Sequence, residues 1–184
     1  MKITATLAMA AVVGTTALAA EQRITVCMQK GTDSLTVYQA QAIISKIYAG
    51  IGVKIDWHRE WRSCPEEAIR ISLDTHTDGA FLPGALAYAL PYEGTHIRIF
   101  YDRLQKSVNP TRVPSRLAHI VAHEIGHILE AVVWHSDRGI MKAAWDADDY
   151  TQMSWKPLEF IAADVELIHR GLDSRESRLR ASAR

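Results

Sequence analysis

The chain has 184 residues, 48% of them hydrophobic, and its 21 basic residues balance 21 acidic residues to a formal net charge of zero. A neutral balance gives no electrostatic attraction for nucleic acid or for an anionic membrane, so we expect neither as a partner. The length fits one domain with a sizeable hydrophobic core. No internal repeat or low-complexity linker divides the sequence.

The first twenty residues have the features of a secretory signal peptide. Lys2 supplies a positive charge, an alanine-rich apolar stretch follows through Leu18, and small residues end the segment at Ala19 and Ala20. The apolar stretch is short for a membrane anchor, which is the competing interpretation. We therefore expect a secreted or periplasmic monomer that has no contact with a membrane once residues 1–20 are removed.

Hydrophobic periodicity predicts an α/β chain. Strands are expected at residues 23–28, 53–58, 68–73 and 97–101, with a short apolar segment at 86–90. Helices are expected at 34–48, from about 114 through the central motif, and at 157–170, where Gly171 would cap the helix. The segment 173–184 is rich in arginine and almost devoid of apolar residues, which predicts a basic flexible tail.

Cys27 and Cys64 are the only cysteines in the chain. Export to an oxidising compartment favours a disulfide between them, which would stabilise the fold by about 3–4 kcal/mol in the chain-entropy model. The alternative is a buried free thiol at Cys27, because this residue lies in an apolar predicted strand.

The most informative motif is HExxH, formed by His123, Glu124 and His127. Four-residue spacing places the two imidazoles one helical turn apart on the same face, where they can bind one zinc ion. Glu124 follows about 100° further round the helix, within reach of a water on that zinc. The pentapeptide alone is also compatible with an amphipathic helix that carries two surface histidines.

Downstream of this motif, His135 and Ser136 are followed by Gly139 and Met141. The combination resembles the metzincin zinc proteases, whose third histidine precedes a turn with a methionine beneath the metal. The sequence departs from the family pattern in two ways: the usual glycine is replaced by Glu130, and the third histidine follows His127 by eight residues instead of six. A group of secreted bacterial metzincin-like proteins has this longer spacer.

The resemblance, which covers about residues 23–172, implies a fold, an activity and a cofactor. The fold would be a twisted mixed sheet over an active-site helix, with a small C-terminal helical part, so that residues 21–172 form the catalytic domain. Zn²⁺ would be held by His123, His127 and His135, with Met141 packed beneath these ligands. The enzyme would be a zinc endopeptidase acting on peptides or proteins through a zinc-activated water, with Glu124 as general base.

Metzincins also bind the substrate backbone as an extra strand at the edge of their sheet. The corresponding edge here would be Ala87, Tyr88, Ala89 and Leu90, because the proline that follows them cannot donate a hydrogen bond to a sheet. An ordinary strand or loop without substrate contact is the alternative.

Two other interpretations remain open. A non-catalytic relative could keep the fold as a binding module, and a gluzincin-type enzyme would use a later glutamate, Glu159 or Glu166, as its third ligand. His119 precedes His123 by one turn, and we interpret it as a neighbour of the ligands, since positions i and i+8 lie about 12 Å apart along a helix. Glu130 could orient a ligand or lie exposed at the helix end.

Overall fold

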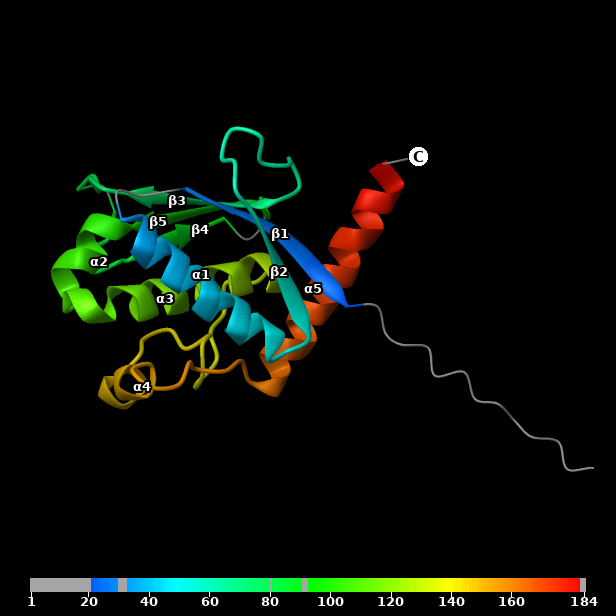
Figure 1. Cartoon of the computed structure of the whole chain (residues 1–184). Coiled ribbons are helices and arrows are strands. Elements are labelled where there is room, and N and C mark those ends of the chain that lie inside the picture. The colour runs from blue at the N-terminus through cyan, green and yellow to red at the C-terminus, as the bar shows by residue number, and fades with distance from the viewer. Residues whose placement is uncertain (1–20, 30–32, 80, 91–92, 183–184) are drawn as a thin grey trace, which may run out of the picture.

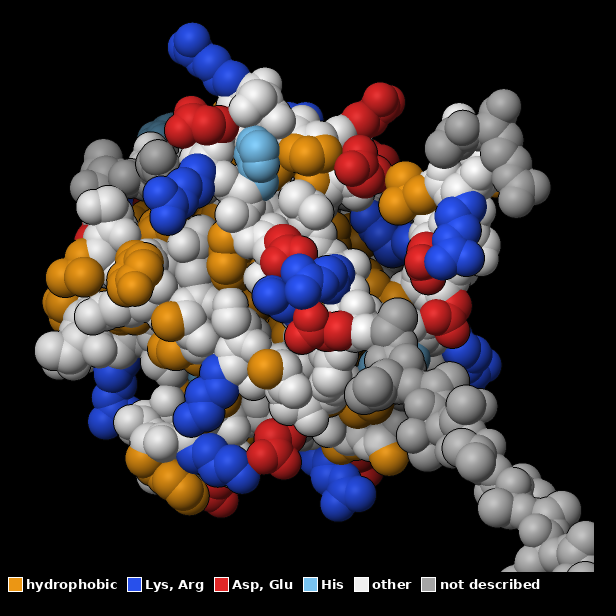
Figure 2. Space-filling model, turned by 45° about the vertical axis from the view of Figure 1, so that its right-hand side comes forward, with side chains coloured by type: hydrophobic (Ala, Val, Ile, Leu, Met, Phe, Trp, Pro, Cys, Tyr) orange, Lys and Arg blue, Asp and Glu red, His pale blue; other side chains and the backbone are white. Residues whose placement is uncertain are grey.

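The computed structural model describes residues 21–29, 33–79, 81–90 and 93–182. The predicted signal peptide, residues 1–20, lies outside this range. Within the described residues, no helix combines the length and the apolar character that crossing a bilayer requires. Basic and acidic side chains are interspersed on the face shown in Figure 2, in keeping with the neutral overall charge.

A five-stranded sheet in the order β2-β1-β3-β5-β4 forms the upper layer of the molecule (Figure 1). Its strands are β1 (Gln22–Met28), β2 (Val53–His58), β3 (Ile69–Asp74), β4 (Ala87–Ala89) and β5 (His96–Phe100). Only β4, at one edge, runs antiparallel to its neighbour. Buried and partly buried residues alternate along β3, because helices cover one face of the sheet there.

The helices are α1 (Ser34–Ala49), α2 (Tyr101–Ser107), α3 (Val113–Glu130), α4 (Ala147–Gln152) and α5 (Ala162–Ser182), with a 3₁₀ turn at Pro110–Arg112. The long helices α1 and α3 lie side by side beneath the sheet (Figure 1). The buried hydroxyl of Tyr48, near the end of α1, donates a hydrogen bond of 2.9 Å to the carbonyl of Ala122 in α3. This contact fixes α1 against the helix that carries the HExxH motif.

The sequence predicted the strands and the two long helices closely, but it missed α2 and α4. Helix α4 has no buried residue, so no hydrophobic periodicity marks it. Its signal is instead a capping box, in which the side chains of Asp146 and Asp149 each accept a hydrogen bond from the other residue's backbone N–H. Helix α2 buries only Tyr101 and Leu104.

The predicted C-terminal boundary is wrong, because α5 runs through Gly171 to Ser182 and residues 157–161 are not helical. Gly171 does not cap the helix. A Cβ atom there would lie 1.7 Å from the carbonyl oxygen of Leu129, so glycine allows the backbones of α5 and α3 to touch. Beyond it, Arg175 donates to the carbonyls of Gly94 and Glu67 at 2.7 and 2.8 Å. Residues 173–182 are therefore helical, in contrast to the predicted flexible tail.

The structure contains the disulfide that the sequence favoured. Cys27 lies in β1 and Cys64 in the loop after β2, with their Cα atoms 6.1 Å apart. Both residues are buried beside Ala68 and the partly buried Trp61. The bridge ties the β2–β3 loop to a central strand, and the alternative of a free thiol at Cys27 is excluded.

We expect the protein, when produced without its first twenty residues in an oxidising compartment and denatured without reductant, to show no titratable thiol. Replacing both cysteines by alanine should lower the free energy of unfolding by about 3–4 kcal/mol, because the unfolded chain regains the entropy of an open loop. Thiol titration and urea denaturation measure these quantities. Two free thiols in the unreduced protein would contradict the bridge.

Candidate active site

Three histidine side chains converge at the lower side of the sheet. His123 and His127 project from successive turns of α3, and His135 reaches them from the loop beyond the helix. The Nε2 atom of His127 lies 3.0 Å from that of His123 and 3.2 Å from that of His135. Each of the three offers a nitrogen to a common point, and all these nitrogens lie within 4.8 Å of one another.

The opposite ring nitrogens fix the tautomers of the two helix histidines. Nδ1 of His123 contacts the carbonyl of Ile140 at 2.9 Å, and Nδ1 of His127 contacts the carbonyl of Val132 at 3.0 Å. A carbonyl can only accept, so both Nδ1 atoms carry the proton and both Nε2 atoms present lone pairs. Burial lowers the pKa of His123 to about 4 and also lowers that of His127, which keeps the rings neutral.

Lone pairs that face each other across 3.0 Å repel unless a cation lies between them. Nitrogens that share one zinc ion, each at about 2.0–2.1 Å in tetrahedral geometry, are roughly 3.3–3.4 Å apart. The nearest separations in the cluster, 3.0 and 3.2 Å, are close to this value. The donor set and its spacing thus fit a zinc ion.

The longer spacer is accommodated at the end of α3. The helix continues through Glu130 and is capped by Ala131, whose φ of 54° is left-handed. Ala131 is the only non-glycine residue with positive φ among those described, a conformation that costs roughly 1–2 kcal/mol for a residue with a Cβ. The turn redirects the chain so that His135 returns to the metal face.

Ser136 holds the chain in place immediately after the third histidine. Its N–H donates to the carbonyl of Met141 at 2.8 Å, and its hydroxyl donates to the carboxylate of Asp164 in α5. Asp164 is 1% exposed and also accepts from the N–H of Ile161. Sequence reasoning missed this role of Asp164, because 28 residues separate it from Ser136 and no local pattern connects them.

Met141, which the resemblance places beneath the metal ligands, packs against α3 at Gly126. It is buried, and a Cβ atom at Gly126, inside the HExxH motif, would lie 2.5 Å from its sulfur. Gly139 has a φ of +76°, and a Cβ atom there would lie 2.4 Å from the carbonyl oxygen of Glu159. The two glycines therefore permit the close packing that holds the methionine turn against α3.

Glu124 lines a cleft of about 380 Å³ together with His123 and His135. Burial raises the pKa of the Glu124 carboxyl to about 7. Leu86 and Ala87 contribute one side of this cleft, and the other side is formed by residues that follow the methionine turn, Lys142, Ala143, Ala144, Trp145 and Tyr150.

Ala87, which lines the cleft, is the first residue of strand β4, which comprises Ala87, Tyr88 and Ala89. Leu90 lies beyond the strand, although its N–H still donates to the carbonyl of His96. Residues Leu86 and Leu90 bond to β5, and Tyr88, between them, is paired with Arg98. Hydrogen-bonded and non-bonded pairs alternate in an antiparallel sheet, so the N–H and C=O groups of Ala87 and Ala89 point away from β5. They face the outer edge of the sheet, where an extended peptide could pair with them.

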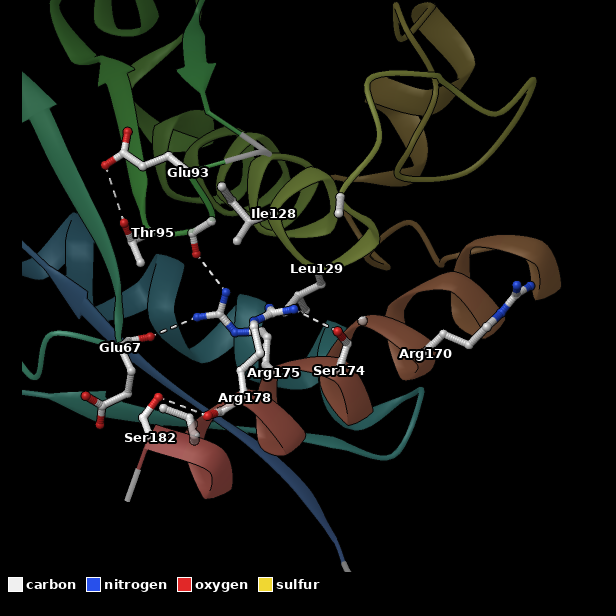
Figure 3. A pocket seen from close by; sticks show the side chains of 14 residues that line it. Glu67, Glu93, Thr95, Ile128, Leu129, Arg170, Ser174, Arg175, Arg178 and Ser182 are labelled. Carbon is white, nitrogen blue, oxygen red and sulfur yellow. Dashed lines mark hydrogen bonds between the residues drawn. The ribbon is translucent and has the colours of Figure 1, made fainter. Parts of the chain in front are cut away.

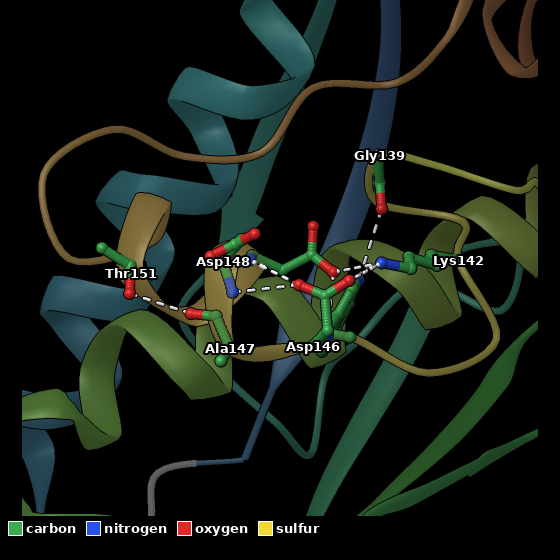
Figure 4. Close-up of polar contacts among 8 residues, drawn as sticks. Gly139, Lys142, Asp146, Ala147, Asp148 and Thr151 are labelled. Atoms are coloured by element: carbon green, nitrogen blue, oxygen red, sulfur yellow. Dashed lines mark hydrogen bonds and ion pairs between the residues drawn. The ribbon is translucent and has the colours of Figure 1, made fainter.

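The lower rim is held by an ionic cluster that the sequence did not reveal (Figure 4). The ammonium group of Lys142 contacts the carboxylates of Asp146 and Asp149, the latter at 2.7 Å, and both raise the pKa of this lysine. The indole N–H of Trp145 donates to the carbonyl of Gly139 at 3.3 Å. These contacts join α4 to the methionine turn and shape the wall of the cleft.

The candidate ligands of the gluzincin alternative lie outside the histidine cluster. The side chain of Glu159 is 72% exposed and pairs with Lys156, and that of Glu166 is 70% exposed and pairs with Arg170. Neither belongs to the cluster around His127. The remaining candidate, His119, is fully buried and has hydrogen-bond partners at both ring nitrogens, so it does not join the cluster.

A larger hollow, of about 670 Å³, lies elsewhere (Figure 3). It lies between the C-terminal part of α5, the end of α3 and the connection from β4 to β5. Arg170, Arg175 and Arg178 line it, and none of the three clustered histidines does. The chemistry of the histidine cluster therefore belongs to the smaller cleft.

Comparison with known proteins gives matches in structure only. No protein-family model and no curated protein matches the sequence. The crystal structure of archaemetzincin from Methanopyrus kandleri aligns with a TM-score of 0.57 at 15% identity, covering 85% of this chain and 99% of that one. A zinc-dependent peptidase from Methanocorpusculum labreanum aligns with a TM-score of 0.53 at 14% identity, covering 79% and 99%. This likeness confirms the expected fold.

Glu130 is buried, not exposed at the helix end, and contacts no histidine through a hydrogen bond. It is 7% exposed, and within the described part of the chain its Oε1 atom has no hydrogen-bond partner. Burial, assisted by the nearby charge of Asp164, raises the pKa of Glu130 from 4.5 to about 8. The folded protein therefore keeps this carboxyl protonated at pH values where the unfolded chain has already released the proton.

It follows that Glu130 should make the fold less stable as the pH rises from about 4.5 to about 8. We expect Glu130→Gln, which cannot ionise, to resemble the parent at pH 4 and to exceed its free energy of unfolding by roughly 1–3 kcal/mol at pH 9. Denaturation of both proteins across this range measures the difference. Glu166→Gln, at an exposed position, is the control, and a difference that did not grow with pH would contradict the buried proton.

Proposed function

We propose that this protein is an exported zinc-dependent endopeptidase. The observation that carries the proposal is the convergence of three imidazole Nε2 atoms, two with their tautomers fixed by backbone carbonyls, beside the carboxyl of Glu124. His123, His127 and His135 would hold the metal. The two structural relatives described above as an archaemetzincin and a zinc-dependent peptidase support the same activity.

When bound, zinc would supply a Lewis acid that activates water and polarises the carbonyl of the scissile peptide bond. A carboxylate oxygen of Glu124 would accept the proton of the attacking water and deliver it to the nitrogen of the departing amine. Met141 has no chemical part in these steps; its packing under α3 keeps the ligand-bearing segments in register. The non-catalytic alternative is disfavoured because every group that this chemistry needs is present.

The substrate would be a peptide or protein segment in extended conformation. Ala87 and Ala89 would bind its backbone through the N–H and C=O groups that face away from β5. Such pairing recognises the main chain on both sides of the scissile bond and requires no free terminus, which favours cleavage within a chain. Export is supported by the features of residues 1–20 and by the disulfide, which is typical of oxidising compartments.

The first functional prediction concerns the proposed base. Glu124→Ala should bind zinc as tightly as the parent, because the carboxyl is not among the ligands, but cleave peptides roughly 10²–10⁴-fold more slowly. Metal analysis of the purified variant and hydrolysis of an unstructured protein substrate such as casein test both halves. Glu166→Ala, which removes an exposed carboxylate, is the control. A Glu124→Ala variant with full activity would refute the assigned mechanism.

The second functional prediction concerns the third ligand. His135→Ala should weaken zinc binding by at least about 10²-fold, since two imidazoles alone leave the metal shell incomplete. Glu159→Ala removes only an exposed ion pair with Lys156 and should leave the affinity unchanged. Competition with a chromogenic zinc chelator measures the affinities. If the two variants bound zinc equally well, His135 would not be a ligand.

A further inference from the structure

His119 is a buried histidine that the proposed chemistry does not use. It is 0% exposed and lies one turn before His123 on α3. Its Nδ1 contacts the carbonyl of Ser115 at 2.7 Å, and its Nε2 accepts a hydrogen bond of 3.0 Å from the N–H of Leu158. Nδ1 must therefore carry the proton, and both ring nitrogens are occupied.

The hydrogen bond to Leu158 is the first of three that lead back to a zinc ligand. The next residue, Glu159, accepts a hydrogen bond of 3.0 Å at its carbonyl from the N–H of Ile140. The carbonyl of Ile140 in turn accepts the Nδ1 proton of His123 at 2.9 Å. Two backbone segments, 158–159 and 139–140, thus connect the ring of His119 to the ring of His123.

An aromatic contact makes the same connection by a second route. The ring of Trp145 meets His119 edge to face, with centroids 6.2 Å apart, and meets His123 in the same way at 5.8 Å. The indole N–H of Trp145 donates to the carbonyl of Gly139, the residue before Ile140. Trp145 therefore contacts both rings, and it also contacts the residue before the carbonyl that binds His123.

We propose that His119 is a positioning residue that fixes the orientation of the His123 ring for metal binding, acting through Leu158, Glu159 and Ile140. The proposal rests on the zinc site described under Proposed function. Leu158 is buried, and the apolar packing of its side chain is less directional than a hydrogen bond in fixing the register of residues 158–159 against α3. The directional bond from its N–H to His119 sets that register, and a shift there displaces the carbonyl that orients His123.

Two polar replacements separate the two hydrogen bonds of His119. The carbonyl of a glutamine side chain reaches about as far as Nε2, so His119→Gln retains an acceptor for the N–H of Leu158. Asparagine is one carbon shorter, so His119→Asn can donate to Ser115 but does not reach Leu158. We expect His119→Gln to stay within about threefold of the parent in zinc affinity and His119→Asn to lose at least about tenfold, the size of effect found when partners of metal ligands are removed.

Zinc affinity is measured by chelator competition, and the visible spectrum of the cobalt-substituted protein reports the ligand geometry. A third measurement needs no metal: in ¹⁵N-histidine spectra of the metal-free protein, the Nδ1 proton of His123 should exchange with water faster in His119→Asn than in His119→Gln. Val26→Ala, in the centre of the sheet, is the control for lost stability alone. It should lower the melting temperature without changing zinc affinity or the exchange of that proton.

Equal zinc affinity, cobalt spectra and Nδ1 exchange in the asparagine and glutamine variants would overturn the positioning role. So would failure of both variants to fold, because His119 would then support the whole domain and not one ligand. These outcomes differ from a failure of the proposed function, in which the parent protein itself would bind no zinc. If the parent bound zinc but had no peptidase activity, zinc affinity and exchange of the Nδ1 proton would still test the role of His119.

Discussion

The site depends on one constraint. Backbone carbonyls accept hydrogen bonds from the Nδ1 protons of His123 and His127, so that the Nε2 lone pairs face one another. Both carbonyls belong to the segment that follows α3, at Val132 and Ile140. The geometry of that segment thus controls the metal site as directly as the spacing of the histidines does.

Glycine is required at three positions where the chain makes close contact with α3 or with the turn at residues 139–141. At Gly126 the missing side chain leaves room for the sulfur of Met141, at Gly139 it lets the turn contact the backbone of Glu159, and at Gly171 it lets α5 touch Leu129. All three contacts connect the C-terminal part of the chain to the metal-binding helix or its turn. The lower half of the molecule is therefore fitted to α3 by close backbone approach as well as by apolar burial.

The sequence predicted what local spacing determines. The HExxH face and the strands follow from periodicity and spacing, and the position of His135 follows from the resemblance to metzincins; the structure places all three histidines together. Helix α4 was missed because it has no buried face, whereas the errors in the C-terminal part come from contacts between residues far apart in the chain. Gly171 has the local signature of a helix cap, yet its environment is the carbonyl of Leu129. Likewise, no local pattern shows that Arg175 is anchored on Gly94, or that a carboxylate at 164 holds Ser136.

The two departures from the metzincin pattern have a common physical explanation. A glycine at position 130 would end α3 there, whereas Glu130 continues the helix and transfers the left-handed turn to Ala131. The chain then leaves α3 one residue later, and the longer spacer compensates by bringing His135 back to the metal face. The continued helix also buries the carboxyl of Glu130 near Asp164, the residue that fixes Ser136. The buried carboxyl of Glu130 and the hydroxyl of Ser136 thus both lie near Asp164, which joins the end of α3 and the segment after His135 to α5.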